Sequence, residues 1–430
     1  MYNHLPVRRR AWQSAAMSLL CTLAAASAAA EGLSDALQAT LRNHPAVAGQ
    51  QAIVQAQRFA ADGARSQRYP TLSAQAQQYT EGDRSSITGE KISNPAILRL
   101  RQPVYSFGRI RNSIALADAE VSTERADLLR VRRQLLEETA VAYALVRGSQ
   151  QRVDAGRRNV AQHNEMLAQI ERRVSGQLAS SADARLATTR LAQARALLEH
   201  AISEWEVARE DLALLTRVAI NADEPVPSGL VDIQASGQLI EQAMAQSADV
   251  HLKQQQLGQA EARVSEARTS AMPTIYLQAD RLYDQPGLRD DSQFSVVFEA
   301  SLEGLGFAAR GRTRSAIARR NAAEEDLAAV KLSLRRELER LERNRRLQAD
   351  LVALQTQALT DLEALLTSYQ RQYESGTKSW LDLMNIQRER HDQQLQLVQA
   401  QNDLVIYSLM LQTRAGGLDT YVTVSEQADG

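Results

Sequence analysis

Two long stretches of the chain carry apolar residues at seven-residue intervals and contain no proline. The first runs from Arg109 to about Val174, and the second from about Arg312 to Glu374. This spacing places a narrow apolar stripe along a helix, which is typical of helices packed in coiled-coil fashion. At ~1.5 Å per residue, each helix is expected to be roughly 90 to 100 Å long. The stripes are Ile114, Val121, Leu128 and Leu135, and Leu327, Leu334 and Leu341.

Other segments alternate between apolar and polar residues, which is the period of a β-strand. In YPTLSAQAQ every second residue from Leu72 to Ala76 is apolar, and in FSVVFEASL the residues Phe294, Val296 and Phe298 share one face. Each such segment is followed or preceded by a polar loop and a second extended segment. The pattern therefore predicts two β-hairpins with long polar tips. They span about 70–105 and about 273–303, with loops at 81–93 and 284–292.

Glycine-containing turns end both long helices. The turns are SGQLASSAD (175–183) and SGTKSWLD (375–382), and a second helix is expected to return after each. Shorter helices are predicted before the hairpins, at about 45–67 and about 248–270. The same order of elements is therefore predicted in both halves of the chain.

The two halves also match residue by residue at a constant offset of 203. Pro70, Thr71 and Leu72 fall over Pro273, Thr274 and Ile275, and further along Gly108 and Arg109 fall over Gly311 and Arg312. Agreement at one offset over this length indicates an internal duplication.

This organisation predicts a first repeat over 31–229 and a second over 230–415. The segment 221–237 contains two prolines and is expected to connect them. Residues 416–430 are expected to form a loose tail. Residues 1–30 follow the order of a secretory signal peptide, with three arginines, an apolar run and small residues.

Composition and charge narrow the function classes. Removal of the signal peptide takes away three arginines and no acidic residue, so the formal net charge goes from -1 to -4, which gives no reason to expect nucleic-acid binding. Cys21 is the only cysteine and lies in the signal peptide, so no disulfide is expected. The mature chain has no long uncharged apolar run. A membrane-spanning form would have to use strands.

Enzymatic chemistry is not expected. The sequence has no H-E-x-x-H, G-x-S-x-G, Walker or C-x-x-C motif. Its six histidines lack metal-ligand spacing, and we expect no cofactor and no metal. They are His4, His44, His163, His200, His251 and His391.

Four strands are too few for a transmembrane barrel, whose smallest members have about 8 strands. The strands would have to be pooled between copies of the chain. Three copies supply twelve, and about ten residues per strand suffice to cross a bilayer with tilt. The pattern predicts a mainly α chain with a small β part, in which a barrel continues into a tube of helices.

The chain resembles the TolC family of outer-membrane channel proteins over nearly all of its mature sequence. The motifs that carry the resemblance are LSDALQATLRNHPAV (33–47), the strand openings YPTL and MPTI, QPVYSFGRIR (102–111) and the two glycine turns. One departure is SLEGLGFAARGR (301–312), where many members carry a second QPVYSFGR-type motif. This departure bears on the subclass of channel.

The resemblance implies a homotrimer with a twelve-stranded barrel in outer-membrane lipid and a long helical tunnel across the periplasm. It also implies two partners: a periplasmic adaptor protein and an inner-membrane ABC transporter or proton-driven pump. The favoured cargo is protein, as in type I secretion, and the alternative is drugs or other small molecules. An alternative from another class is a soluble periplasmic coiled-coil adaptor or scaffold.

The same resemblance assigns roles to residues near the turns. Asp382 and Asn385 would form the constriction of the periplasmic entrance, with one acidic ring from Asp382. The alternative for Asp382 is a solvated aspartate at a helix start, stabilised by the helix dipole. Tyr373 and Lys378 would latch the closed entrance by bonding to Asp183. The residues expected to contact the adaptor are Ser175, Gly176, Gln177, Ser375, Gly376 and Thr377.

Overall fold

A computed structural model describes residues 32–76, 96–233, 237–283, 291–301 and 303–428. The predicted signal peptide and the loop at 81–93 lie outside these residues, as does most of the loop at 284–292.

The elements follow the duplicated order that the sequence predicts. The first half contains α1 (Leu33–Asn43), α2 (Pro45–Ser66), β1 (Thr71–Ala76), β2 (Ala96–Tyr105), α3 (Arg109–Ser175) and α4 (Ser181–Thr216). After the short α5 (Ser228–Val231), the second half contains α6 (Gly237–Gln246), α7 (Ala248–Thr269), β3 (Thr274–Tyr283), β4 (Asp291–Glu299), the 3-10 turn η1 (Glu303–Gly306), α8 (Phe307–Glu374) and α9 (Trp380–Arg414). The chain closes with α10 (Gly417–Ala428).

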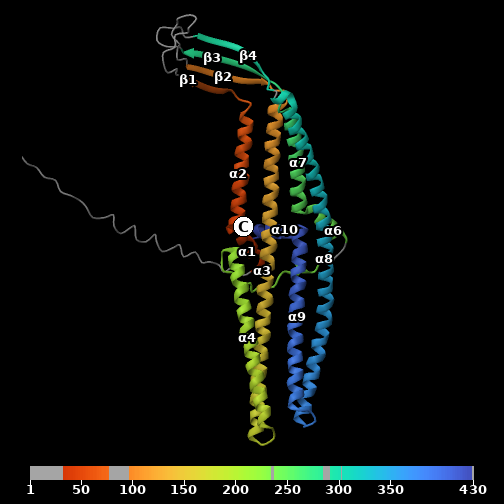
Figure 1. Ribbon diagram of the computed structural model, residues 1–430. Helices are drawn as coiled ribbons and strands as arrows, with labels where there is room; N and C mark the ends of the chain where they lie inside the picture. Colours follow the sequence, from red (N-terminus) through yellow and green to blue (C-terminus); the bar gives the residue numbers. More distant parts are fainter. Residues whose placement is uncertain (1–31, 77–95, 234–236, 284–290, 302, 429–430) are drawn as a thin grey trace, which may run out of the picture.

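The helices form an elongated layer with the sheet at one end and two helical turns at the other (Figure 1). α3 and α8 run the whole length of this layer. Beside the sheet-proximal half of α3 lie α2 and α7, and beside its other half lie α4 and α9. No helix in the described part of the chain is both long and apolar enough to cross a lipid bilayer.

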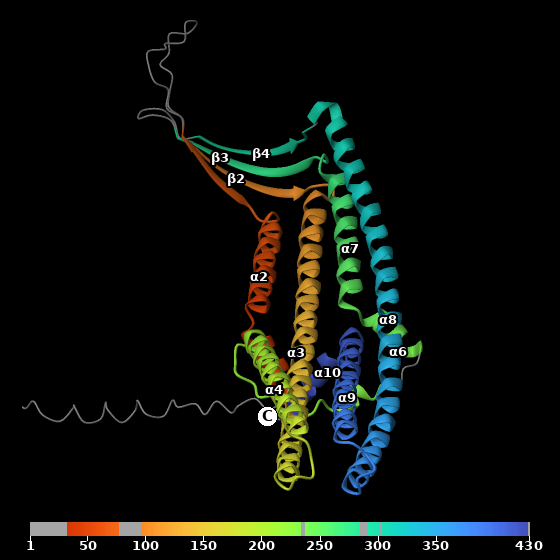
Figure 2. The same ribbon diagram turned by 60° about the horizontal axis from the view of Figure 1, so that its bottom comes forward.

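The four strands form one antiparallel sheet in the order β1-β2-β3-β4. Each predicted hairpin is present, and β2 pairs with β3 to join the two repeats, with Leu100 opposite Ala279. The sheet curves away from the top of the helices in the second view (Figure 2). It is therefore a shared element of both repeats.

The duplication is confirmed, but its register shifts after the hairpins. β1 begins at Thr71 and β3 at Thr274, an offset of 203. The glycines that start the long helices in a left-handed conformation are Gly108 (φ 89°) and Gly306 (φ 88°), an offset of 198. The predicted match of Gly108 to Gly311 is wrong, because the second hairpin is five residues shorter. For the same reason α8 begins at Phe307 and not at about Arg312.

The predicted loose tail after Gly416 is also wrong. Residues from Gly417 form α10, which packs on α1 and α9. Leu418 and Val422 are buried, and Arg133 Nε lies 2.6 Å from Asp419 Oδ2. Burial of these two apolar side chains, together with the ion pair, explains why the segment is ordered against the core.

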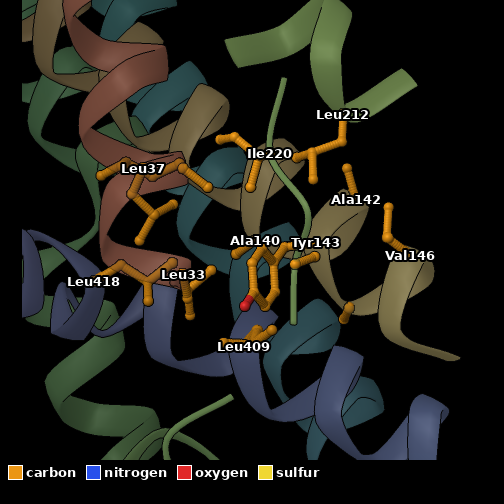
Figure 3. Packing of buried hydrophobic residues seen from close by; sticks show 14 of the residues in the cluster. Leu33, Leu37, Ala140, Ala142, Tyr143, Val146, Leu212, Ile220, Leu409 and Leu418 are labelled. Atoms are coloured by element: carbon orange, nitrogen blue, oxygen red, sulfur yellow. The ribbon is translucent and has the colours of Figure 1, made fainter. Parts of the chain in front are cut away.

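The main hydrophobic core lies where α1 and α10 pack beside the middle of α3 (Figure 1). Its side chains are seen from close by in Figure 3. It joins α1, α3, α4, α9 and α10, and Tyr143 at its centre is fully buried. The Tyr143 hydroxyl donates a hydrogen bond of 2.7 Å to the Glu224 carbonyl oxygen. Burial raises the pKa of Tyr143 to about 12, so the hydroxyl stays a donor. This core fixes the connector between the repeats against both long hairpins.

Candidate functional sites at the helical tips and the sheet

Both helical tips follow the same backbone path. In the first, Gln177 has φ 59° and the next residue, Leu178, donates its N–H to the Arg173 carbonyl at 2.7 Å. In the second, Gly376 has φ 80° and Thr377 donates to the Gln372 carbonyl at 2.9 Å. Both are Schellman-type helix ends. The equivalent residues are therefore Gln177 and Gly376, since Gly176 has an ordinary φ of -83°.

A glutamine in this left-handed position is strained. Left-handed helical conformation costs roughly 1–2 kcal/mol for a residue with a Cβ atom. Gln177→Gly is expected to stabilise the first tip by about 1 kcal/mol. Amide hydrogen exchange at Leu178 measures this change as slower exchange. The matched control, Gly376→Ala, should speed exchange at Thr377, and equal exchange in all variants would contradict the strain.

Asp183 and Asp382 occupy equivalent positions after the two turns. Each is the third residue of its helix and completes a capping box with a serine, Ser180 or Ser379. Asp382 Oδ2 accepts hydrogen bonds from Ser379 Oγ at 2.8 Å and from Ser379 N at 3.2 Å. The Ser379 hydroxyl and, next, its backbone N–H lower the pKa of Asp382. In one copy of the chain, Asp382 thus stabilises a helix start, as the alternative interpretation expected.

The three predicted latch residues do not meet at one point. Tyr373 is buried, and Asp183 is near enough for its charge to raise the pKa of Tyr373, although burial is the larger cause. Lys378 Nζ instead lies 4.5 Å from the centre of the Tyr369 ring, and its charge lowers the pKa of Asp382. Among the described residues, no hydrogen bond joins Asp183 to Tyr373 or to Lys378.

Two residues that the sequence did not single out surround Tyr373. The Arg173 guanidinium lies 4.5 Å from the centre of the Tyr373 ring, and the Trp380 ring lies 5.4 Å from it. Tyr373 and Trp380 belong, with Ile170 from α3 and Ala187 from α4, to a hydrophobic cluster that joins the two helical hairpins near their tips. The sequence feature that could have pointed to this cluster is Trp380, a tryptophan directly after a turn.

The residues predicted to contact an adaptor all lie at the exposed turns. Exposed apolar side chains accompany them at both tips, Leu178 at 73% and Leu381 at 51%. Neither was predicted from sequence. Apolar side chains at such a rim favour contact with another protein. The six predicted residues are Ser175, Gly176, Gln177, Ser375, Gly376 and Thr377.

A buried polar cluster holds α3 against α9 above the tips. His163 and His391 are each less than a tenth exposed, and Nδ1 of both lacks a hydrogen-bond partner among the described residues. Next to them Arg390 Nη2 donates to Gln162 Oε1 at 2.5 Å. Burial lowers the pKa of both histidines. The charges of Arg190 and Arg390 add to this effect at His163 and His391 respectively.

These pKa shifts predict a loss of stability in acid. The unfolded chain binds protons at the histidines near pH 6.5, whereas the folded chain binds them only at lower pH. The contribution of the neutral histidines to stability is therefore fully present above about pH 6.5. It is lost as the pH falls from there to the folded pKa values, and each histidine loses about 1.4 kcal/mol for every unit by which its folded pKa lies below the unfolded one. The double variant His163→Gln with His391→Gln should weaken the dependence of the free energy of unfolding on pH, measured between pH 4 and 7. An unchanged pH dependence would contradict this origin.

One face of the sheet is apolar and open. Phe294, Val296 and Phe298 share one face of β4, as the alternation predicted, and they are between 65% and 85% exposed in the single chain. Cross-strand pairing places Leu277 beside Val296. Leucines of β1 and β2 that are exposed on this face are Leu72, Leu98 and Leu100. A face of this kind suits hydrocarbon and is costly in water.

The opposite face carries ion pairs between strands. Arg99 Nε lies 2.9 Å from Asp280 Oδ1, and Arg101 pairs with Glu299. The Arg101 guanidinium also lies over the Tyr276 ring. Apolar and charged residues therefore point to opposite faces of the sheet. In outer-membrane strands the same alternation places apolar side chains against lipid and polar side chains against an aqueous lumen.

A sheet with these two faces, continuous with long helical hairpins, defines a channel protein of the outer membrane. The sequence model of the family described as outer membrane efflux protein matches residues 36–216 and 239–417, one match in each repeat. These matches cover most of the chain, which therefore belongs to this family. Membership confirms the predicted resemblance and the outer-membrane location. It also confirms that the protein is a channel rather than an enzyme, and it favours a channel over a soluble scaffold.

Solved structures share the fold at low sequence identity. The outer-membrane channel OprN matches with a TM-score of 0.76 and 20% identity over 90% of each chain. The outer membrane protein VceC of Vibrio cholerae matches with 0.75 and 19%, over 90% of this chain and 96% of its own. The open state of the Neisseria gonorrhoeae channel MtrE matches with 0.74 and 19%, over 90% and 89%. No curated protein matches the chain by sequence.

Proposed function

We propose that three copies of the chain form one exit duct of a tripartite export machine. The observation that carries the proposal is the sheet, which has one apolar and one charged face and leaves the outer edges of β1 and β4 without a strand neighbour among the described residues. Unpaired edges are a liability that closure into a barrel removes. Three sheets side by side supply twelve strands, with the charged face inside.

The helical tips form the periplasmic entrance of this duct. Asp382, repeated three times around the axis, provides an acidic ring, and Asn385, one turn further along α9, provides a neutral one. Asn385 is exposed in the single copy, and the hydrogen bonds from Ser379 keep Asp382 ionised. The ring therefore attracts cations at neutral pH.

The test is the ion selectivity of the purified protein in planar lipid bilayers. Asp382→Asn is expected to lower the cation-to-anion permeability ratio several-fold, because fixed charges at a constriction govern selectivity. Asp183→Asn is the matched control, since Asp183 has the same capping role at the other tip. Because Asp183 also belongs to the proposed latch, the two variants are compared in the Tyr373→Phe background. An equal loss of selectivity in both variants, or in neither, would refute the ring. Tyr373→Phe provides an opened background if the wild type is shut at rest.

The use of Tyr373→Phe to open the entrance depends on the latch, which is also part of the proposal. The charge of Asp183 raises the pKa of Tyr373 after the larger effect of burial, whereas the charge of Lys378 lowers the pKa of Asp382 after the larger effect of the Ser379 hydrogen bonds. We therefore assign the closing contact to Tyr373 and Asp183, and give Lys378 the role of a counter-charge to the ring.

The exposed tips dock the periplasmic adaptor, which links the duct to an inner-membrane transporter. Leu178 and Leu381 supply apolar contacts, and the polar turn residues supply hydrogen bonds. The favoured cargo is secreted protein, and the second candidate is small molecules. The two differ in their energy source: co-purification of an ABC transporter supports secretion, and co-purification of a proton-driven pump supports small-molecule efflux.

A further inference from the structure

Four exposed arginines lie where the helices meet the sheet (Figure 2). Arg111 is in the first turn of α3, Arg268 is in the last turn of α7, and Arg310 and Arg314 are near the start of α8. None of the four guanidinium groups has an ion pair or a hydrogen bond to another described residue. These four residues form the arginine collar.

Aromatic rings mark the end of the apolar sheet face beside the collar. A bulge after Pro103 places Tyr105 opposite Ile275, which in turn is opposite Phe298 of the apolar face. The Phe107 ring packs on Tyr105 with 4.6 Å between the ring centres. Outer-membrane barrels carry aromatic residues at the level where hydrocarbon meets the lipid headgroups. The collar therefore begins at the edge of the hydrocarbon.

Helix geometry places Arg111 on the same side of the molecule as the apolar sheet face. Arg109 donates a hydrogen bond of 3.2 Å to the Tyr276 hydroxyl, and Tyr276 lies on the charged face. Arg111 is two residues further along, which is about 200° around the axis of α3. The Arg111 side chain therefore points away from the charged face.

Arg268 points the same way from α7. Arg263 of α7 pairs with Glu120, which lies three turns below Arg109 and on the same side of α3. Arg268 is five residues after Arg263, which is about 140° around the axis of α7. It is therefore turned away from the side of the helices that continues the charged sheet face.

The arginines of α8 match Arg111 of α3. The two helices run in the same direction, away from the sheet. Val121 packs α3 on α2, and Ile317 packs α8 on α7. Arg111 and Arg314 lie roughly 60–80° from these packed residues, in the same sense of rotation. The collar therefore faces outward on both long helices.

The described chain does not neutralise this positive surface. Neither long helix has an acidic residue in its first turn, and α8 has none before Glu324. Positive charge at a helix start opposes the helix dipole, so local helix stability does not account for these arginines. Asp118, on the same side of α3 as Arg111, is already paired with Arg65. The collar is suited to an anionic partner outside the chain.

We propose that the arginine collar binds the phosphate groups of anionic phospholipids in the membrane leaflet that faces the periplasm. Arg314 is the collar residue furthest from the sheet, seven residues from the start of α8, or roughly 11 Å. The headgroup layer extends roughly 5–8 Å beyond the hydrocarbon, and a long arginine side chain spans the remaining distance. Arginine also matches the geometry of a phosphate group. The inference rests on the apolar face meeting lipid, as in the proposed duct.

Lipid retention by the purified full-length protein tests the collar. Protein in neutral detergent is mixed with equal amounts of phosphatidylglycerol and phosphatidylcholine, and the lipids retained after size-exclusion chromatography are counted by mass spectrometry. The wild type should retain phosphatidylglycerol in preference by about fivefold or more, because each basic side chain near the surface favours anionic lipid. Arg310→Gln with Arg314→Gln should lower this preference at least about twofold, and the quadruple glutamine variant of the collar should abolish it.

Two further double variants separate charge and position from other effects. Arg336→Gln with Arg340→Gln is the matched control, because these residues are exposed on α8 at the same four-residue spacing but lie far from the sheet. The preference should be unchanged in this control. Arg310→Lys with Arg314→Lys keeps the positive charge and should keep most of the preference.

Two results overturn the collar and leave the proposed duct standing. One is an equal preference in the collar and control variants. The other is loss of the preference when millimolar inorganic phosphate replaces chloride at constant ionic strength, because the arginines then take free phosphate and not a lipid headgroup. If the wild type retains neither phospholipid, the apolar face does not meet lipid, and the collar and the duct are both wrong.

Discussion

Val296→Arg should prevent most of the protein from assembling in the outer membrane. Val296 lies near the middle of β4 on the apolar face and is 69% exposed in the single chain. An arginine facing lipid near the bilayer midplane costs ≈ 2–4 kcal/mol, and three copies would carry it in one barrel. The measurement is the fraction of heat-resistant oligomer in the outer-membrane fraction.

Ser295→Arg is the matched control, because it places the same side chain one residue away on the charged face. That face already holds Arg99 and Arg101, so assembly should be close to that of the wild type. If Ser295→Arg is the more harmful change, the apolar face does not meet lipid. The assignment of the two faces would then have to be reversed.

Tyr143→Ala should destabilise the central core by about 3–5 kcal/mol, the usual cost of removing a buried aromatic ring. Tyr143 is fully buried among side chains from α1, α4, α9 and α10 (Figure 3). Its loss should loosen the connector at Glu224, whose carbonyl the described hydrogen bonds tie down only through the Tyr143 hydroxyl, while Arg147 still donates to the neighbouring Asp223 carbonyl oxygen at 2.8 Å. The free energy of unfolding in detergent measures this cost.

Tyr143→Phe separates the ring from the hydroxyl. This variant keeps the packing and leaves the Glu224 carbonyl without its donor, so about 1–3 kcal/mol is expected. Equal destabilisation by Phe and Ala would mean that the hydrogen bond, and not the ring, holds the core together. No effect from either variant would contradict the central role of this core.

Strong local signals made most of the fold predictable from the sequence. α2 and α7 end within one residue of their predicted bounds, since a proline or serine starts each helix and a turn before a strand ends it. The alternation around Val296 correctly placed Phe294, Val296 and Phe298 on one face of β4. Periodicity of this kind is set by local geometry and persists in any tertiary context.

The errors at α10 and around Tyr373 come from contact between distant segments. α10 is ordered by burial of Leu418 against α1, and nothing near Gly416 in sequence signals that contact. At the first tip the turn is closed by Gln177, so the glycine beside it misled the alignment. The surroundings of Tyr373 depend on how two hairpins approach each other, and sequence does not give that distance.

Cryo-electron microscopy of the full-length protein in lipid nanodiscs tests the account most directly. The account predicts three copies around a closed twelve-stranded barrel, with Val296 against lipid, Arg99 and Asp280 lining the lumen, and the Asp382 carboxylates converging at the far end of the tunnel. A single copy with an open sheet, or a barrel with Val296 facing inward, would contradict it.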